Sequence, residues 1–214
     1  MSIDDTAAYD AWYQTPRGRW IGECEYRLLR KLLAYPSNAS LLDVGCGTGY
    51  FSRRFSQGGL SVIGIDADLA TLGFAQSQHG DIHYIQGNAL ALPFPDNAFE
   101  CSMAVTSLCF VDDPLPALRE MWRVTRQSLV LGLLNRHSLL YRKKLGQGGY
   151  AGARWDTAGT VLNAWVPGLS PSPEKVELRS AVFLPRGTGM AKRVEQWLPD
   201  TLRLGGFLAV GLGK

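Results

Sequence analysis

SLLDVGCGTGYFSRRF, residues Ser40 to Phe55, sets three glycines within five positions between an apolar run and a segment with helical spacing. Glycine loses more conformational freedom on folding than any other residue, so this cluster predicts a backbone turn that other side chains would not allow. The flanking residues predict a strand over 41–44 and a helix over 50–57. Ligands bind at the carboxyl ends of strands in open α/β sheets, so the turn is a candidate binding loop.

On both sides of this turn, short apolar β-rich runs alternate with segments of helical spacing. Strands are expected over 41–44, 61–66, 82–85, 99–105 and 128–134, and helices over 23–34, 50–57, 68–77 and 114–125. This alternation predicts βαβ units and a parallel sheet with right-handed crossovers. Two later strand-like runs, 176–184 and 206–212, enclose a helix expected over 191–198 and predict an antiparallel finish.

The length and composition predict one ordinary domain. A chain of 214 residues can bury one substantial core, and 46% hydrophobic with 19% charged residues is a typical globular composition. The apolar runs are too short to span a bilayer and the first ten residues are acidic, which favours a cytoplasmic protein without a membrane span. The cysteines have no CxxC spacing, so reduced and mostly buried thiols are expected at Cys24, Cys46, Cys101 and Cys109.

Charge is distributed unevenly along the chain. Residues 1–107 hold seven Lys and Arg against eleven Asp and Glu, whereas residues 108–214 hold fifteen against eight. A solvated basic face is the preferred interpretation over steering of an anionic substrate, and no nucleic acid partner is expected because no basic stripe is interleaved with aromatics. His79 and His83 have the spacing of a helical metal pair, but Gly80 intervenes and His83 begins a strand, so no metal is expected.

Two common nucleotide-binding patterns do not fit the glycine turn. The dinucleotide pattern G-x-G-x-x-G fails in both registers, because its last glycine would fall on Tyr50 or Ser52. The P-loop pattern fails because no Gly-Lys-Ser/Thr follows the turn. Asp43, two residues before the first glycine, would repel pyrophosphate and attract a cationic amine. Asp66 closes the second strand, where a carboxylate can accept both ribose hydroxyls, so an amino-acid-bearing nucleotide is predicted.

These motifs resemble those of the class I S-adenosylmethionine-dependent methyltransferases, in particular the small-molecule branch with the quinone-biosynthesis C-methyltransferases (methyltransferase type 11). The resemblance is carried by LLDVGCGTGYFS (41–52), VIGIDAD (62–68), IQGNALALPFPDNAFE (85–100), TSLCFVDDP (106–114) and LRLGGFLAVGLG (202–213). It implies a three-layer αβα Rossmann-like sandwich with a mostly parallel seven-stranded sheet and an antiparallel last strand. It also implies the cofactor S-adenosyl-L-methionine, with S-adenosyl-L-homocysteine as product.

Within this resemblance the single domain over 1–214 has three parts: an N-terminal lid and helix (1–35), a cofactor-binding core (36–135), and substrate-side and C-terminal strands (136–214). YDAWYQTPRGRW (9–20) resembles a lead-in segment that packs over the cofactor in some relatives, with Tyr9, Trp12 and Tyr13 as lid residues. Trp12 and Tyr13 are also interpretable as core aromatics. Whether the protein is a monomer or a homodimer is left open.

The resemblance assigns cofactor-binding roles by position. The glycine turn would approach the methionine part, Asp43 its amino group, Asp66 the ribose, and Thr106 with Ser107 the sulfonium. Asn88 stands where the family usually has an acid, and its side-chain oxygen could accept from the adenine amino group without charge. The full predicted set is Asp43, Gly45, Cys46, Gly47, Gly49, Asp66, Ala67, Leu69, Asn88, Ala89, Leu90, Thr106 and Ser107.

Methyl transfer is an in-line displacement, which positioning can accelerate and which needs a general base only for a protonated nucleophile. His137 and Tyr13 are the predicted catalytic residues, with Asp112 and Asp113 as further candidates. The segment after strand four lacks the Asn-Pro-Pro-aromatic motif associated with methylation of adenine or glutamine, so a small-molecule methyl acceptor is expected. Two alternatives stay open: a non-catalytic S-adenosylmethionine-binding or assembly protein, and a nicotinamide dehydrogenase, which the glycine register disfavours.

Overall fold

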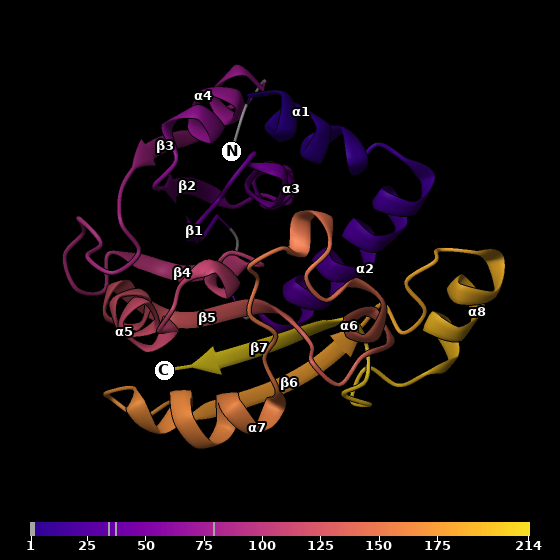
Figure 1. Ribbon diagram of the computed structural model, residues 1–214. Helices are drawn as coiled ribbons and strands as arrows, with labels where there is room; N and C mark the ends of the chain where they lie inside the picture. The colour runs from indigo at the N-terminus through magenta and orange to yellow at the C-terminus, as the bar shows by residue number, and fades with distance from the viewer. Residues whose placement is uncertain (1–2, 34, 37, 79) are drawn as a thin grey trace.

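A seven-stranded sheet forms the centre of the molecule in the computed structural model, which describes residues 3–33, 35–36, 38–78 and 80–214 (Figure 1). The strand order is β3-β2-β1-β4-β5-β7-β6, and β7 alone runs antiparallel to its neighbours. The strands are β1 (Ser40–Val44), β2 (Ser61–Asp66), β3 (His83–Gln86), β4 (Phe99–Val105), β5 (Thr125–Leu134), β6 (Lys175–Ala181) and β7 (Phe207–Gly213). The predicted fold class is confirmed.

The helices include all four predicted in the first 125 residues, in some cases with different bounds. They are α1 (Ile3–Trp12), α2 (Pro16–Leu32), α3 (Tyr50–Gln57), α4 (Leu69–Ser77), α5 (Pro114–Val124), α6 (Leu139–Lys144), α7 (Ala158–Thr160) and α8 (Gly189–Trp197). Shorter turns are η1 (Leu108–Phe110), η2 (Gly148–Tyr150), the π-helical η3 (Val161–Trp165) that continues α7, and η4 (Val166–Gly168).

Two hydrophobic cores lie on opposite faces of the sheet. Successive residues of a strand point to opposite faces, so Leu41 joins the core beneath α2 and α3 whereas Leu42 joins the core beneath α5 and η3. Met103 and Ala104 of β4 divide in the same way. Because β1 and β4 are buried on both faces, apolar residues predominate in both strands and do not simply alternate with polar ones.

The sheet places the candidate binding loop at a reversal of strand order. From β1 the chain proceeds outward through β2 to β3, and β4 then returns to pair with the other side of β1. Figure 1 shows β3 and β6 at opposite edges of the sheet, with β1 and β4 between them. A crevice forms at the carboxyl ends of strands that flank such a reversal.

The helix predicted from Glu23 begins earlier, at Pro16, and its predicted end at Ala34 lies outside the described residues. Thr15 caps the helix by accepting the N–H of Gly18, and Pro16 occupies the first helical position. Gly18 and Gly22 weaken the helical pattern of this first half in the sequence. In the structure, a Cβ at Gly18 would overlap the Trp12 carbonyl and one at Gly22 would overlap the Tyr50 hydroxyl. Close packing therefore explains both glycines.

The C-terminal region contains more helix than the sequence predicts, because short turns form within the expected loops. The strand predicted to reach Leu184 ends at Ala181, since Val182 takes a left-handed backbone conformation with φ of +65°. Glu195 of α8 holds this bend by accepting the N–H groups of Val182 and Phe183 at 2.7 and 2.9 Å.

The cysteines, all of which lie in the described part of the chain, carry no disulfide in the structure. All four cysteines are free; Cys46, Cys101 and Cys109 are buried and Cys24 is partly buried, as predicted. Among the helices of the described residues, none has the length and apolar character needed to cross a membrane.

The packing of α2 leads to a prediction. Gly18→Ala should lower the free energy of unfolding by about 1 to 3 kcal/mol, because the added methyl group overlaps backbone that cannot rotate away. Gly73→Ala in α4 is the matched control: nothing lies within 4 Å of its added Cβ, so the substitution should stabilise by about 0.5 to 1 kcal/mol. Urea denaturation measures both, and equal effects would contradict the close approach of α2 to the N-terminal segment.

Candidate functional site

The glycine turn between β1 and α3 uses the conformational freedom of all three glycines. Gly45, Gly47 and Gly49 have φ of +68°, +53° and +76°, in the left-handed region that favours glycine. A Cβ at Gly45 would overlap the Ser107 side chain, and one at Gly49 would overlap the Tyr84 hydroxyl. A Cβ at Gly47 would meet nothing within 4 Å. The turn is therefore packed at both ends and open at its centre.

A cavity of about 740 Å³ lies over this open centre and the carboxyl ends of β1, β2 and β4. Its volume falls within the range of about 300 to 1,000 Å³ typical of small-molecule and cofactor sites. Twelve of the predicted residues line it: Tyr9, Trp12, Tyr13, Gly45, Cys46, Gly47, Asp66, Ala67, Asn88, Ala89, Thr106 and Ser107. Residues far apart in the sequence thus meet at one site.

Asp66 joins the glycine turn to the end of β2. One carboxylate oxygen accepts the N–H of Gly47 at 2.8 Å, and the other accepts the N–H of Asp68 at 3.0 Å. A carboxylate has about four acceptor positions, so two remain toward the cavity. This arrangement both fixes the turn and leaves capacity for a pair of hydroxyl donors.

Asp43 lies behind the turn and does not line the cavity. Its side chain is 2% exposed and accepts a hydrogen bond from the Ser52 hydroxyl at 2.5 Å. Burial raises the pKa of the Asp43 carboxyl to about 7, although the Ser52 hydrogen bond acts in the opposite direction. Asp43 therefore ties β1 to the first turn of α3, and its predicted contact with an amino group is not direct in this structure.

Four other predicted residues also lie outside the cavity lining: Gly49, Leu69, Leu90 and His137. Gly49 packs against the Tyr84 hydroxyl, whereas Leu69 and Leu90 are 64% and 46% exposed. Asn88 does line the cavity, but its side-chain oxygen accepts the N–H of Leu90 at 2.9 Å and so closes its own turn. Local turn chemistry therefore occupies the atom that was expected to face an adenine amino group.

His137 is the fourth of these residues. It is exposed, and its backbone N–H donates to the Asn135 side chain at 3.0 Å. Of the further base candidates, Asp113 caps α5 by accepting the N–H of Leu115, and neither it nor Asp112 lines the cavity. Tyr13 alone among the predicted bases reaches the cavity.

Thr106 and Ser107 form the cavity wall beyond β4. Thr106 has φ of +50°, which is strained for a β-branched residue and costs on the order of 1 to 3 kcal/mol. Its N–H donates to the Gly132 carbonyl at 2.8 Å, and the Ser107 hydroxyl donates to the Val44 carbonyl at 2.8 Å. These bonds to both neighbouring strands hold the strained segment beside the glycine turn.

The N-terminal segment is pinned over the turn by charge and by ring stacking. Arg53 of α3 donates to Asp10 and to the Thr48 carbonyl, both at 2.7 Å. The Tyr13 ring stacks on Tyr50 with ring centroids 3.7 Å apart. Tyr13 is 4% exposed and belongs to the core beneath α2, yet it also lines the cavity. The core interpretation of Tyr13 is therefore correct, and closure of the segment as a lid stays a prediction.

Sequence reasoning missed the part of the wall that comes from α2. Arg17, Ile21 and Glu25 lie at positions i, i+4 and i+8 of this helix and all line the cavity. The same spacing is visible in the sequence, but only once the helix is known to begin at Pro16. Lys144 and Tyr150 of the later region also line the cavity and were missed.

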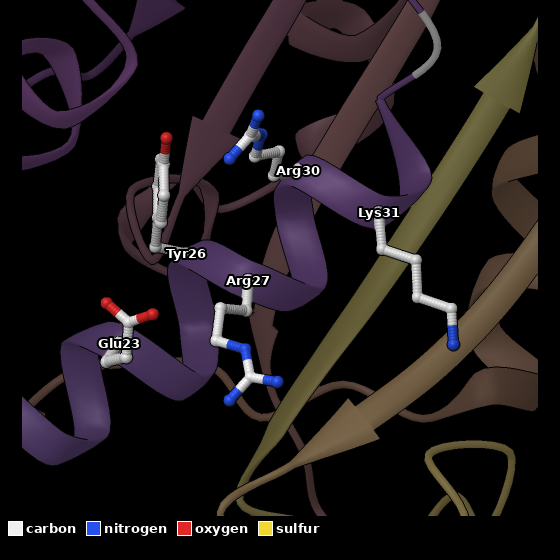
Figure 2. A pocket seen from close by; sticks show the side chains of 5 residues that line it. All are labelled: Glu23, Tyr26, Arg27, Arg30 and Lys31. Carbon is white, nitrogen blue, oxygen red and sulfur yellow. The ribbon is translucent and has the colours of Figure 1, made fainter. Parts of the chain in front are cut away.

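The opposite face of α2 bears a second, shallow hollow lined by charged side chains and one tyrosine (Figure 2). Glu23 there pairs with Arg54, and Lys31 pairs with Asp200, each at 2.5 Å. Figure 2 shows Glu23, Arg27 and Lys31 projecting from the helix, as expected of a solvated surface. None of these residues shares the cavity over the glycine turn, so the hollow is not part of the site.

Metal chemistry has no visible support at the site. Within the described ranges there is no group of three or more His, Cys, Asp or Glu side chains placed to hold a metal ion. His79, one half of the histidine pair considered from the sequence, lies outside the described residues.

Comparison with known proteins identifies the family. Residues 42–131 match the model described as a methyltransferase domain. An uncharacterized protein of Mycobacterium tuberculosis is 35% identical over 96% of this chain and 71% of its own length. A methyltransferase structure from Thermotoga maritima, described as a possible histamine N-methyltransferase, has a TM-score of 0.78 at 21% identity and covers 99% of this chain and 97% of that one. Residues 42–131 therefore belong to the methyltransferase-domain family, and the chain as a whole has the fold of S-adenosylmethionine-dependent methyltransferases.

Relatives with named activities match a shorter segment. The demethylmenaquinone methyltransferase of Renibacterium salmoninarum is 41% identical over 86 residues, which are 40% of this chain and 36% of that protein. The malonyl-[acyl-carrier protein] O-methyltransferase of Pectobacterium atrosepticum is 34% identical over 49% of this chain and 41% of its own length. The chain therefore matches well under half of the length of either protein.

The buried Asp43 carboxyl leads to a prediction on pH. Its pKa in the folded chain is raised above that of an unfolded aspartate, so its favourable contribution is complete below about pH 4 and is lost as the pH rises through about 7. The stability of the wild type should fall relative to Asp43→Asn by on the order of 4 kcal/mol across this window, because burial raises the pKa by about three. Urea denaturation at pH 4, 5, 6, 7 and 8 measures the difference, and parallel pH profiles would contradict the burial of an unpaired charge.

Proposed function

We propose that the protein transfers a methyl group from S-adenosyl-L-methionine to a small-molecule acceptor and releases S-adenosyl-L-homocysteine. The observation that carries this proposal is that one cavity is lined by the glycine turn, Asp66 and the segment after β4, and also by tyrosines of the N-terminal segment and Tyr150. A cytoplasmic location and a monomeric or homodimeric state, both expected from the sequence, belong to the same proposal.

The residues at the strand ends fit the cofactor by their donor and acceptor chemistry. The open space at Gly47 allows backbone approach, and Asp66 retains acceptor capacity for two ribose hydroxyls. The short side chains of Ala67 and Ala89 border the space on the adenine side. When bound, the cofactor supplies an electrophilic methyl group on a sulfonium, which Thr106 and Ser107 would face.

The remainder of the cavity fits an acceptor of small-molecule size. Its wall is formed by the N-terminal segment, α2, α6 and the ends of β5 and β7, with apolar and aromatic residues predominating: Tyr9, Ile21, Leu134, Leu140, Tyr150, Val182 and Phe207. Such a wall excludes water and orients the acceptor for in-line attack, and this positioning supplies much of the rate. The relatives named for demethylmenaquinone and for a malonyl group on an acyl-carrier protein support an acceptor group of this size.

A cavity that continues beyond the cofactor-binding residues favours an enzyme over a protein that only binds the cofactor. A binding or assembly protein needs no such continuation, and a filled or flat surface beside Thr106 would serve it equally well. The strained backbone of Thr106 and Val182, both at the cavity wall, also favours a reactive site, because strain of this kind concentrates where substrates bind.

Cofactor binding tests the assignment directly. Asp66→Ala should weaken binding of S-adenosyl-L-homocysteine by about 2 to 4 kcal/mol, because a charge-assisted acceptor in the half-buried cavity wall is lost. Asp81→Ala, an exposed aspartate outside the cavity, is the matched control and should bind as the wild type does. Isothermal titration calorimetry gives both affinities, and thermal melting confirms that each variant is folded.

Turnover is tested with methyl-labelled S-adenosyl-L-methionine and a metabolite extract. The wild type should transfer label to a small molecule, and Asp66→Ala should transfer at least tenfold less at equal cofactor concentration. Unchanged affinity in Asp66→Ala, or tight binding of NAD in place of S-adenosyl-L-homocysteine, would refute the cofactor assignment.

A further inference from the structure

Glu25 is the one carboxylate of the cavity wall, within the described residues, that has neither a hydrogen bond nor an ion pair. Asp66 and Asp68, which also line the cavity, accept backbone N–H groups. No donor contacts the Glu25 side chain, and burial alone raises the pKa of its carboxyl to about 8. Neither of the lining cations, Arg17 and Lys144, offsets this increase.

An unpaired carboxylate in a cavity wall costs free energy that an apolar side chain would not. Ile21 occupies the preceding turn of the same face of α2, so an apolar residue is compatible with this surface. Glu23, two residues away on the outer face, has the ion-pair partner Arg54 that Glu25 lacks. The position of Glu25 is therefore explained by a partner that arrives with a ligand and not by folding.

Three tyrosines share the cavity wall with Glu25: Tyr9, Tyr13 and Tyr150. Burial raises the pKa of each of these hydroxyls, and the charge of Glu25 raises it further. The Tyr9 and Tyr13 hydroxyls are 3.3 Å apart, and the Thr106 side chain, which lowers the pKa of Tyr9, lines the same cavity. Hydroxyl groups thus extend from the cavity wall that holds Glu25 toward the segment after β4.

A carboxylate beside tyrosine rings is a favourable environment for a cationic nitrogen, because ion pairing and cation–π attraction act together where water is excluded. Arg17, which would repel such a group, begins two helical turns away on α2, about 12 Å along the helix axis. Its guanidinium donates to the Pro185 carbonyl at 2.7 Å. The apolar residues Leu134, Leu140 and Phe207 line the same cavity and can contact an uncharged body.

We propose that Glu25 binds a basic nitrogen of the methyl acceptor, so that the acceptor is an amine or nitrogen heterocycle with an apolar or aromatic body. This inference rests on the proposed function and names its substrate class. Glu25 acts here as a specificity-determining residue. The hydroxyl groups of Tyr13, Tyr9 and Thr106 place the bound nitrogen compound toward the end of the cavity where transfer would occur.

The test uses three probes of similar size and different charge: 2-phenylethylamine, 2-phenylethanol and phenylacetate. Each is titrated by calorimetry into the full-length protein saturated with S-adenosyl-L-homocysteine, at pH 8. The wild type should bind the amine at least tenfold more tightly than the alcohol. Glu25→Gln should abolish this preference while keeping its affinity for the alcohol. Glu23→Gln, on the outer face of the same helix, should keep the preference of the wild type.

The pH dependence of amine binding separates recognition from a structural role. The amine remains protonated up to about pH 10, as alkylamines do, so its affinity for the wild type should rise from pH 6 to pH 8 as Glu25 ionises. The charged and titratable groups that face Glu25 are Arg17, Lys144, Tyr9, Tyr13, Tyr50, Tyr150 and Cys24. Glu25→Gln keeps all of them and should lose the rise.

Different results would overturn the role of Glu25 and the proposed function. A wild type that prefers phenylacetate, or a Glu25→Gln variant with unchanged amine selectivity, overturns the role of Glu25 while binding of S-adenosyl-L-homocysteine persists. Loss of S-adenosyl-L-homocysteine binding by the wild type itself would overturn the proposed function. Thermal melting of each variant accompanies the titrations, and an unfolded Glu25→Gln is replaced by Glu25→Met, for which the same loss of selectivity is expected.

Discussion

The hydrogen bond from the Gly47 N–H to the Asp66 carboxylate is the constraint on which the site depends. It joins the ends of two adjacent strands, and it requires the turn to approach β2 closely. The Ile65 carbonyl reinforces this approach by accepting the N–H groups of Gly45 and Cys46. This geometry requires a left-handed backbone conformation at three residues within five positions, and glycine adopts that conformation with the least strain. The open face of the turn follows from the same constraint.

Part of the cavity wall comes from the N-terminal segment, which is held in place by several contacts of different kinds. The Asp10–Arg53 ion pair is largely removed from solvent, so it is less screened than the exposed pairs of the surface. Ring stacking at Tyr13 and the missing side chains of Gly18 and Gly22 let α1, α2 and α3 meet at one point. The glycine turn and the rest of the cavity therefore share a wall.

The parallel part of the fold was predictable because its determinants are local. The bounds of β2 and β4 coincide with their apolar runs, and each of these runs is closed by a turn or a cap. The start of α2 was not predictable, because its glycines disfavour helix in isolation and only packing against Trp12 and Tyr50 accounts for them. The same holds for the left-handed conformation of Val182, which depends on Glu195 from a later helix.

In the candidate site, too, some residues could be predicted from the sequence and others could not. The glycine turn and Asp66 could be located from spacing, since the backbone alone dictates their arrangement. Asn88 could be located but its oxygen could not be oriented, because a competing turn hydrogen bond decides that. Glu25 could not be singled out among the charges of α2, since the direction of each side chain depends on which face of the helix the sheet covers.

The cavity wall is assembled from two separate parts of the chain, and this has a consequence for how such a protein can change. The family match covers residues 42–131, which hold the glycine turn, Asp66 and the segment after β4. Glu25, Tyr150, Val182 and Phe207 lie before or after it. Substitutions in these flanking regions can reshape the part of the cavity wall that they form, while the glycine turn and Asp66 keep their geometry. Selection can therefore diversify what is modified without rebuilding the machinery that supplies the modifying group.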